Sequence, residues 1–122
     1  MILVDTSVWI DHFREGDSLL RSLLQQRQVL VHPFIVGELA LGNMRERNVI
    51  LRALSDLPKA LFADEAEVLG YIERRALSGS GIGYLDAHLL TSVQMTPDAL
   101  LWTRDKRLAH VAARLSLAFA VR

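Results

Sequence analysis

Two aspartates follow apolar runs that have the composition of buried strands. Asp5 ends the run 2–4, and Asp105 comes shortly after the run 99–102. An unpaired carboxylate is costly to bury, so an acid at the exit of a buried strand needs a partner or a function. Both positions are therefore candidates for chemistry that uses negative charge.

Two further acids fall on helical stripes of apolar residues. Asp86 starts a stripe at spacing i, i+3, i+4, i+7, and Glu38 belongs to another stripe. We expect both acids to face a core. No Lys or Arg is spaced to neutralise all four acids, and the convergence of several carboxylates indicates a bound cation. The partners on the two stripes are Leu89, Leu90 and Val93 for Asp86, and Phe34, Ile35, Leu41 and Gly42 for Glu38.

Each acid also has a purely structural interpretation. Asp5 and Asp105 can cap the helices that follow them, and Asp86 gains from the dipole of the helix that it begins. Glu38 can be an ordinary solvated residue at the edge of its stripe. These separate explanations do not account for four acids on the same edge of the inferred fold.

The elements that must position these acids alternate between strands and helices. This alternation predicts an α/β fold with a mainly parallel sheet, right-handed crossovers and helices on both faces. Ligands of such sheets gather at the carboxyl ends of the strands, where Asp5 and Asp105 are placed. The expected strands are 1–5, 29–31, 59–62, 99–102 and 117–121, and the expected helices are 6–13, 17–27, 33–42, 45–55, 64–77, 86–93 and 106–115.

Composition restricts the function classes. The 122 residues are 51% hydrophobic, which predicts a single domain, 1–122, with a core of its own. Cysteine is absent, which excludes disulfides, thiolate metal sites and cysteine nucleophiles. No apolar run approaches the ~20 residues of a membrane span, so we expect a cytoplasmic protein with no membrane partner. The formal charge is zero, so RNA binding depends on local basic patches.

Four segments carry a resemblance to a known family. They are residues 5–11 (DTSVWID), 36–42 (VGELALG), 85–90 (LDAHLL) and 101–105 (LWTRD). Their order and separation resemble those of a PIN-domain nuclease, and the chain closely resembles the VapC toxins of bacterial toxin–antitoxin pairs. The resemblance extends from Asp5 to the final expected strand. His88 departs from the pattern, because this family often has a small or apolar residue there, and we assign it no role.

The resemblance implies a three-layer α/β/α PIN domain that acts as a metal-dependent endoribonuclease. Asp5, Glu38, Asp86 and Asp105 would form its acidic quartet, with Mg²⁺ or Mn²⁺ held by the three aspartates and Glu38 orienting the attacking water. A carboxylate cluster suits these hard cations better than zinc, and hydrolysis would release a 5′-phosphate and a 3′-hydroxyl. One or two ions fit the quartet. The supporting hydroxyls would be Thr6, Ser7 and Thr103.

Partners follow from charge and from apolar surface. Basic residues near the motif ends can hold RNA phosphates, although such residues are usually just solvated. They are Arg14, Arg45, Arg47, Arg104, Lys106 and Arg107. The family implies a homodimer and a cognate VapB-type antitoxin, whose tail would enter an apolar groove. The groove residues would be Trp9, Ile10, Phe13 and Leu20, with Leu23 and Leu24.

Other functions fit the residues less well. A haloacid-dehalogenase-like phosphotransferase needs a second Asp two residues after the first, where this chain has Ser7. A receiver domain needs an acidic pair near the first strand and a phosphoacceptor Asp in mid-chain, and neither pattern is present. The stronger alternatives are a PIN nuclease of RNA processing that has no antitoxin, and a non-catalytic interaction module. The four histidines have no ligand spacing, and we interpret them as structural.

Overall fold

Three short parallel strands form the centre of the computed structural model, which describes residues 1–121. They are β1 (Ile2–Val4), β2 (Val29–Leu30) and β3 (Leu100–Trp102), in the order β2-β1-β3. Ile2 of β1 is in register with Val29 on one side and with Leu100 on the other. All three residues of β1 are buried, as expected for a central strand with both faces covered.

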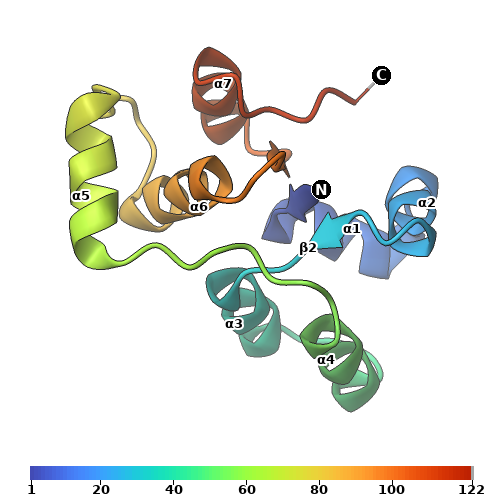
Figure 1. Ribbon diagram of the computed structural model, residues 1–122. Coiled ribbons are helices and arrows are strands. Elements are labelled where there is room, and N and C mark those ends of the chain that lie inside the picture. The colour runs from blue at the N-terminus through green and yellow to red at the C-terminus, as the bar shows by residue number, and fades with distance from the viewer. Residues whose placement is uncertain (122) are drawn as a thin grey trace.

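Helices lie on both sides of this sheet. Figure 1 shows α3 and α4 on one side of the strands and α5, α6 and α7 on the other, which confirms the predicted α/β class with a parallel sheet. The helices are α1 (Thr6–Glu15), α2 (Ser18–Gln25), α3 (Pro33–Leu41), α4 (Arg47–Ser55), α5 (Glu65–Arg74), α6 (Tyr84–Met95) and α7 (Lys106–Arg114).

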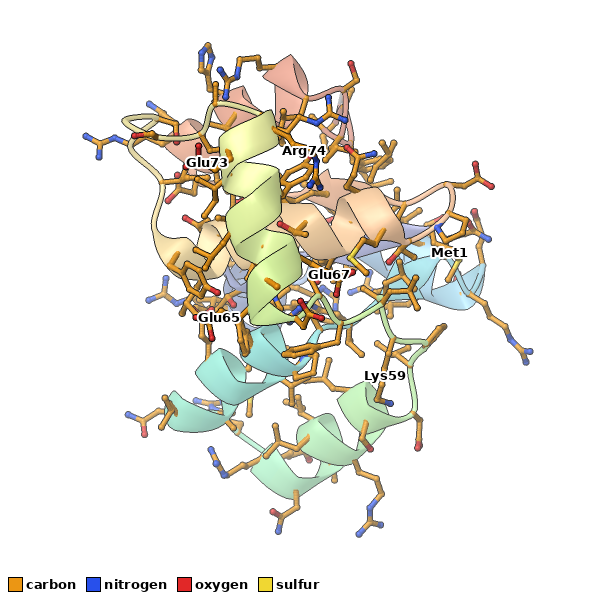
Figure 2. The ribbon with its side chains drawn as sticks, turned by 60° about the vertical axis from the view of Figure 1, so that its left-hand side comes forward. Met1, Lys59, Glu65, Glu67, Glu73 and Arg74 are labelled. Atoms are coloured by element: carbon orange, nitrogen blue, oxygen red, sulfur yellow. The ribbon has the colours of Figure 1, made fainter. Side chains whose placement is uncertain are left out.

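Local sequence signals explain where several helices begin. The Asp17 side chain accepts the Leu20 N–H at 2.9 Å and so caps α2. Asp64 and Glu67 form a capping box at the start of α5, where each side chain accepts a backbone N–H of the other residue. Figure 2 shows Glu65 and Glu67 at this end of α5 and Arg74 at the opposite end, the charge arrangement that the helix dipole favours.

The predicted strands 59–62 and 117–121 are wrong, because each makes only one isolated bridge. Lys59 pairs with Val31, and the Ala60 N–H donates to the Val31 carbonyl at 2.9 Å. The ladder ends there because the next donor position is Pro33, which has no N–H and begins α3. Ala118 pairs with Leu101 of the short strand β3, and the ladder extends no further. Both segments follow the sheet edge without becoming strands.

The largest fully buried side chains come from the strands and from the helix faces that cover them, and they include Leu3, Val8, Leu20, Ile35 and Leu90. None of the helices in residues 1–121 combines the length and the apolar character that a bilayer crossing requires.

Candidate active site

The sheet brings Asp5 and Asp105 to the same edge. Asp5 follows β1 and Asp105 follows its neighbour β3, and the Asp5 N–H donates to the Trp102 carbonyl at 2.9 Å. The chain leaves β1 toward β2 on one side and reaches β3 on the other, so this edge is a topological switch point of the sheet. The predicted meeting of the two strand ends is confirmed.

Two hydroxyl groups orient the buried carboxylate of Asp5. Its Oδ2 accepts the Thr103 hydroxyl at 2.7 Å and the Ser7 hydroxyl at 3.3 Å. The Thr103 oxygen in turn accepts the Asp105 N–H at 3.1 Å, and the Ser7 oxygen accepts the Arg104 N–H at 3.0 Å. Because backbone donors occupy lone pairs of both hydroxyls, their protons are directed at Asp5.

The capping interpretation therefore holds for one strand acid and fails for the other. The Asp5 side chain makes no capping hydrogen bond to α1. Asp105 does cap α7, because its Oδ1 accepts the Leu108 N–H at 3.0 Å. The expected hydroxyl support comes from Ser7 and Thr103, whereas the Thr6 hydroxyl is buried with no hydrogen-bond partner in residues 1–121.

The two helix acids reach the same edge from α3 and α6. Asp86 is half-buried, and its stripe partners Leu89, Leu90 and Val93 are buried as predicted. Glu38 is exposed, so the prediction that it faces the core is wrong. The buried face of α3 is formed by Ile35 and Leu39, which leaves Glu38 on the side of the helix toward the other acids.

The two helix acids respond to the charges of their acidic neighbours. Burial raises the pKa of the Asp86 carboxyl, and the negative charges of Asp5 and Asp105 raise it further. Partial desolvation of its carboxyl raises the pKa of Glu38, with additional contributions from the charges of Asp5 and Asp86. The ion pairs within residues 1–121 join Arg104 to other acids and leave these four unneutralised.

The donor set of this edge consists of oxygen atoms. Carboxylate and hydroxyl oxygens are the ligands that Mg²⁺ and Mn²⁺ prefer. Among the residues that the structure describes, no three Asp, Glu or His side chains stand close enough together to hold a metal ion as they are. The edge is an acidic, oxygen-lined site with one carboxylate, that of Asp5, fixed by two hydroxyls.

Comparison with known proteins agrees with this geometry. The model of the PIN domain family matches residues 2–114. The chain belongs to the PIN-domain family. It is 46% identical over 120 residues to Ribonuclease VapC32 of two Mycobacterium tuberculosis strains, CDC 1551 / Oshkosh and ATCC 25618 / H37Rv, with 98% of this chain and 97% of each relative covered. Within the family the chain is therefore of the VapC type.

A solved structure supports the same fold. The structure described as FitAB bound to an IR36 DNA fragment superposes with a TM-score of 0.57 at 18% sequence identity, covering 93% of this chain and 91% of that one. At this level of identity the likeness shows the fold alone.

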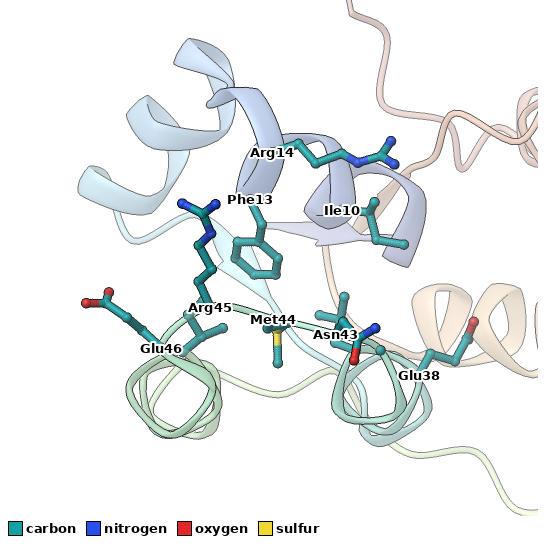
Figure 3. Close-up of a pocket in the computed structure, with 11 residues that line it drawn as sticks. Ile10, Phe13, Arg14, Glu38, Asn43, Met44, Arg45 and Glu46 are labelled. Atoms are coloured by element: carbon teal, nitrogen blue, oxygen red, sulfur yellow. The ribbon is translucent and has the colours of Figure 1, made fainter.

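A groove leads from the acidic edge of this PIN domain along α1, α3 and α4. Its volume is about 720 Å³, and Figure 3 shows Glu38 at one end and Glu46 at the other. Ile10 and Phe13 line it, as expected. The remaining lining residues are Arg14, Leu39, Gly42, Asn43, Met44, Arg45 and Ile50. Sequence reasoning missed the contribution of α3 and the segment before α4, because Leu39, Met44 and Ile50 come from three successive segments and share no helical or strand period.

Two of the predicted groove residues belong to the core instead. Trp9 is 3% exposed and stacks on Phe13 with 5.7 Å between ring centroids. Leu20 is fully buried because the apolar stripe of α2 faces inward. A helix face that covers a core is not available to a partner, so our interpretation of Trp9 and Leu20 as partner contacts is wrong.

The basic residues fall into two groups. Arg14 and Arg45 line the groove, and Lys106 is exposed in the first turn of α7, next to Asp105. These three positions remain candidates for RNA phosphates. Arg104 differs, because Asp11 and Asp17 bind its guanidinium at 2.5 and 2.6 Å. Our interpretation of Arg104 as a phosphate contact loses its basis, since the charge is already neutralised within the protein.

His32 connects the two helices that carry the helix acids. Its Nδ1 accepts the Phe34 N–H at 3.1 Å and caps α3, and its Nε2 lies 3.2 Å from the Ser92 hydroxyl of α6. Burial, together with the neighbouring His88, lowers the pKa of His32 to about 4. The imidazole is neutral, with Nδ1 as acceptor and Nε2–H as donor, which agrees with the structural role that we expected for the histidines.

Proposed function

We propose that this PIN domain is a metal-dependent endoribonuclease and acts as the toxin of a VapBC-type pair. The observation that carries the proposal is the gathering of four carboxylates at the carboxyl edge of the sheet, where the charges of their acidic neighbours raise the pKa values of Glu38 and Asp86. The name of the relative, a ribonuclease of the VapC series at 46% identity over nearly the whole chain, supports the same activity.

Asp5, Asp86 and Asp105 are the residues that would hold Mg²⁺ or Mn²⁺. The donor chemistry fits, because the set is made of oxygen atoms and Asp5 is already oriented by the Ser7 and Thr103 hydroxyls. These side chains do not yet surround one point, so the proposal includes their approach when an ion binds. When bound, the ion lowers the pKa of a water molecule and neutralises charge on the phosphate.

The residues around the metal site would have different roles in RNA hydrolysis. Glu38 is exposed at the edge with a raised pKa, which suits a group that orients water and accepts its proton. Asp86, half-buried beside Asp5, keeps negative charge at the centre of the site. Arg14, Arg45 and Lys106 would contact phosphates on either side of the scissile bond.

The groove supports an antitoxin as the inhibitory partner. Ile10, Phe13 and Met44 offer apolar contact along its length, and Glu38 offers negative charge at its end. A helical or extended tail with an apolar stripe and a terminal basic residue matches this arrangement. Binding would cover the acidic edge and exclude RNA. We propose, in addition, that the chain forms a homodimer, as its resemblance to VapC toxins implies.

The experiment is RNA cleavage by the purified chain with Mg²⁺, with Mn²⁺ and with a chelator, followed by analysis of the product ends. The proposal expects ion-dependent cleavage that leaves 5′-phosphates and 3′-hydroxyls, and arrested growth when the chain is expressed in a bacterial host. Full activity in chelator would contradict the metal mechanism.

Co-expression with the product of the neighbouring gene tests the toxin role separately. We expect a stable complex in which cleavage is suppressed, and a mass measurement of the free chain that gives a dimer. A chain that cleaves RNA equally well with and without that product would instead be a processing nuclease.

A further inference from the structure

Arg104 ties the loop between β3 and α7 to the first two helices. Its Nη1 donates to Asp11 of α1 at 2.5 Å, and its Nη2 donates to Asp17, the cap of α2, at 2.6 Å. The guanidinium also lies over the Trp102 ring, 5.8 Å from the ring centre. One side chain therefore fixes the position of this loop against both α1 and α2.

The same loop supplies the donors that orient Asp5. The Arg104 N–H donates to the Ser7 hydroxyl, and the Asp105 N–H donates to the Thr103 hydroxyl. Both hydroxyls donate to Oδ2 of Asp5. A shift of this loop would lengthen these hydrogen bonds together, and it would also displace Asp105.

We propose that Arg104 is a positioning residue of the acidic site, which acts by clamping the β3–α7 loop onto Asp11 and Asp17. The inference rests on the proposed metal-dependent function and extends it to a residue that touches neither ion nor RNA. A planar guanidinium reaches two carboxylates at once, which a lysine ammonium cannot reproduce in the same geometry.

The clamp contributes little to global stability. The side chains of Arg104, Asp11 and Asp17 are 37%, 43% and 19% exposed, and solvent-accessible ion pairs typically stabilise a fold by less than about 1 kcal/mol each. A defect in ion binding without a matching loss of stability is therefore the signature of positioning. Partners that orient the ligands of a metal typically change its affinity by about 10- to 100-fold.

If Arg104 acted only through its charge, the expected change in Mg²⁺ affinity would have the opposite sign. If Arg104 acted only as a positive charge near the acids, Arg104→Gln would strengthen Mg²⁺ binding and Arg104→Lys would leave it unchanged. If Arg104 acts as a clamp, both variants weaken binding, because neither bridges the two carboxylates. Asp11→Asn removes one anchor at α1 and leaves Arg104 in place. Because it also removes a negative charge, weaker ion binding in this variant supports the clamp only together with faster amide exchange at positions 104 and 105.

The experiment measures Mg²⁺ and Mn²⁺ affinity by calorimetry for wild type and the three variants, with Arg52→Gln on α4 as the charge-matched control. It also follows hydrogen exchange of the backbone amides at positions 104 and 105 without metal. We expect about 10-fold weaker ion binding in all three variants, faster exchange at both amides, and melting temperatures close to that of the control.

Two results would overturn the inference. In the first, Arg104→Lys and Asp11→Asn bind ions as tightly as wild type or more tightly, and both amides exchange as in wild type. This result would contradict the positioning role of Arg104 and would leave the proposed function intact. A wild-type chain that binds neither ion would remove the proposed metal site and the inference together.

Discussion

The acidic site is built from two halves that are held in different ways. The half formed by the strand ends is fixed by hydrogen bonds, because two hydroxyls donate to Asp5 and the Asp105 carboxylate caps α7. The half formed by the helices carries Glu38 and Asp86, whose pKa values are raised by partial desolvation and by neighbouring acids. The carboxylates of the first half already accept their hydrogen bonds before any ligand binds. In the second half, repulsion between the acids is relieved only when a cation binds.

The connection within the helix half is also of a different chemical kind. His32 caps α3 and lies within hydrogen-bond distance of Ser92 on α6, so an imidazole links the helices of Glu38 and Asp86. The strand half uses hydroxyls and backbone N–H groups, which do not titrate near neutral pH. Acidification should therefore loosen the helix half and spare these bonds of the strand half.

Asp5→Asn should have the largest effect on activity. It removes the negative charge at the centre of the site while Asn can still accept the Ser7 and Thr103 hydroxyls. We expect RNA cleavage to fall by at least about 10³-fold, about 4 kcal/mol of transition-state stabilisation, and the Mg²⁺-induced rise in melting temperature to disappear. Cleavage assays and thermal melts with and without Mg²⁺ measure both, with Asp56→Asn on the exposed end of α4 as control. A variant that cleaves RNA and is stabilised by Mg²⁺ like wild type would remove Asp5 from the site.

The second prediction concerns His32 and pH. The pKa is about 4 in the folded protein and about 6.5 in an unfolded chain, so the unfolded state binds more protons between these values. The contribution of neutral His32 to the free energy of unfolding is therefore complete above pH 6.5. It is lost as pH falls toward 4, by up to about 3 kcal/mol. The raised pKa values of Glu38 and Asp86 act in the opposite direction, because protonation of these acids at low pH relieves their repulsion.

A variant isolates the contribution of His32 from that of the acids. Urea unfolding of wild type and His32→Asn between pH 7.5 and 4.5 should give a stability difference that is constant above about pH 6.5 and shrinks below it, because Asn caps α3 without titrating. His110→Asn on the exposed face of α7 serves as the control. Parallel pH profiles for wild type and His32→Asn would show that the imidazole does not control the helix half.

Glu38→Gln tests the catalytic share of the helix half. The substitution keeps the volume of an exposed side chain, so the fold should be unaffected. Loss of a group that orients water should lower cleavage by about 10²-fold, the lower end for general acid–base effects. Glu46→Gln, at the other end of the same groove, is the matched control and should cleave like wild type. Equal rates for the two variants would make Glu38 an ordinary solvated residue.

The sequence was sufficient to predict the strand half of the site. Apolar runs that end in Asp5 and near Asp105 identify parallel strands, and parallel strands place their carboxyl ends at one edge by geometry. The hydroxyl support was an implication of the resemblance to VapC toxins, which named Ser7 and Thr103 correctly and Thr6 incorrectly. The ion pairs of Arg104 could not, because Asp11 and Asp17 are 93 and 87 residues away in the chain. Long-range pairing of charges depends on the fold and leaves no periodic signal.

The helix half was predicted less well. Helical spacing gave the correct face for Asp86 but the wrong one for Glu38, because α3 is apolar on nearly all sides and has no clear stripe. Leu41, which we placed on the buried stripe, is 91% exposed. We assigned Trp9 and Leu20 to the partner groove for a similar reason, because the sequence pattern of an apolar helix face is the same whether the face covers a core or binds a partner.

Thr103→Val tests the strand half and should give the smallest of these effects. It keeps the shape of a buried-edge side chain but removes the 2.7 Å hydrogen bond to Asp5 and the acceptor of the Asp105 N–H. We expect about 10-fold weaker Mn²⁺ binding and about 10-fold slower cleavage at limiting ion concentration, the typical effect of losing a hydrogen bond that orients a metal ligand.

Thr103→Ser retains the hydroxyl, and its ion affinity and cleavage rate should stay close to those of wild type, which separates the hydrogen bond from packing. Saturating Mn²⁺ should restore much of the rate to Thr103→Val, because the carboxylate is still present and only its orientation is relaxed. A Val variant that binds Mn²⁺ like the Ser variant would mean that β1 and β3 alone hold Asp5 in place, and that the two halves of the site differ less than the hydrogen bonds indicate.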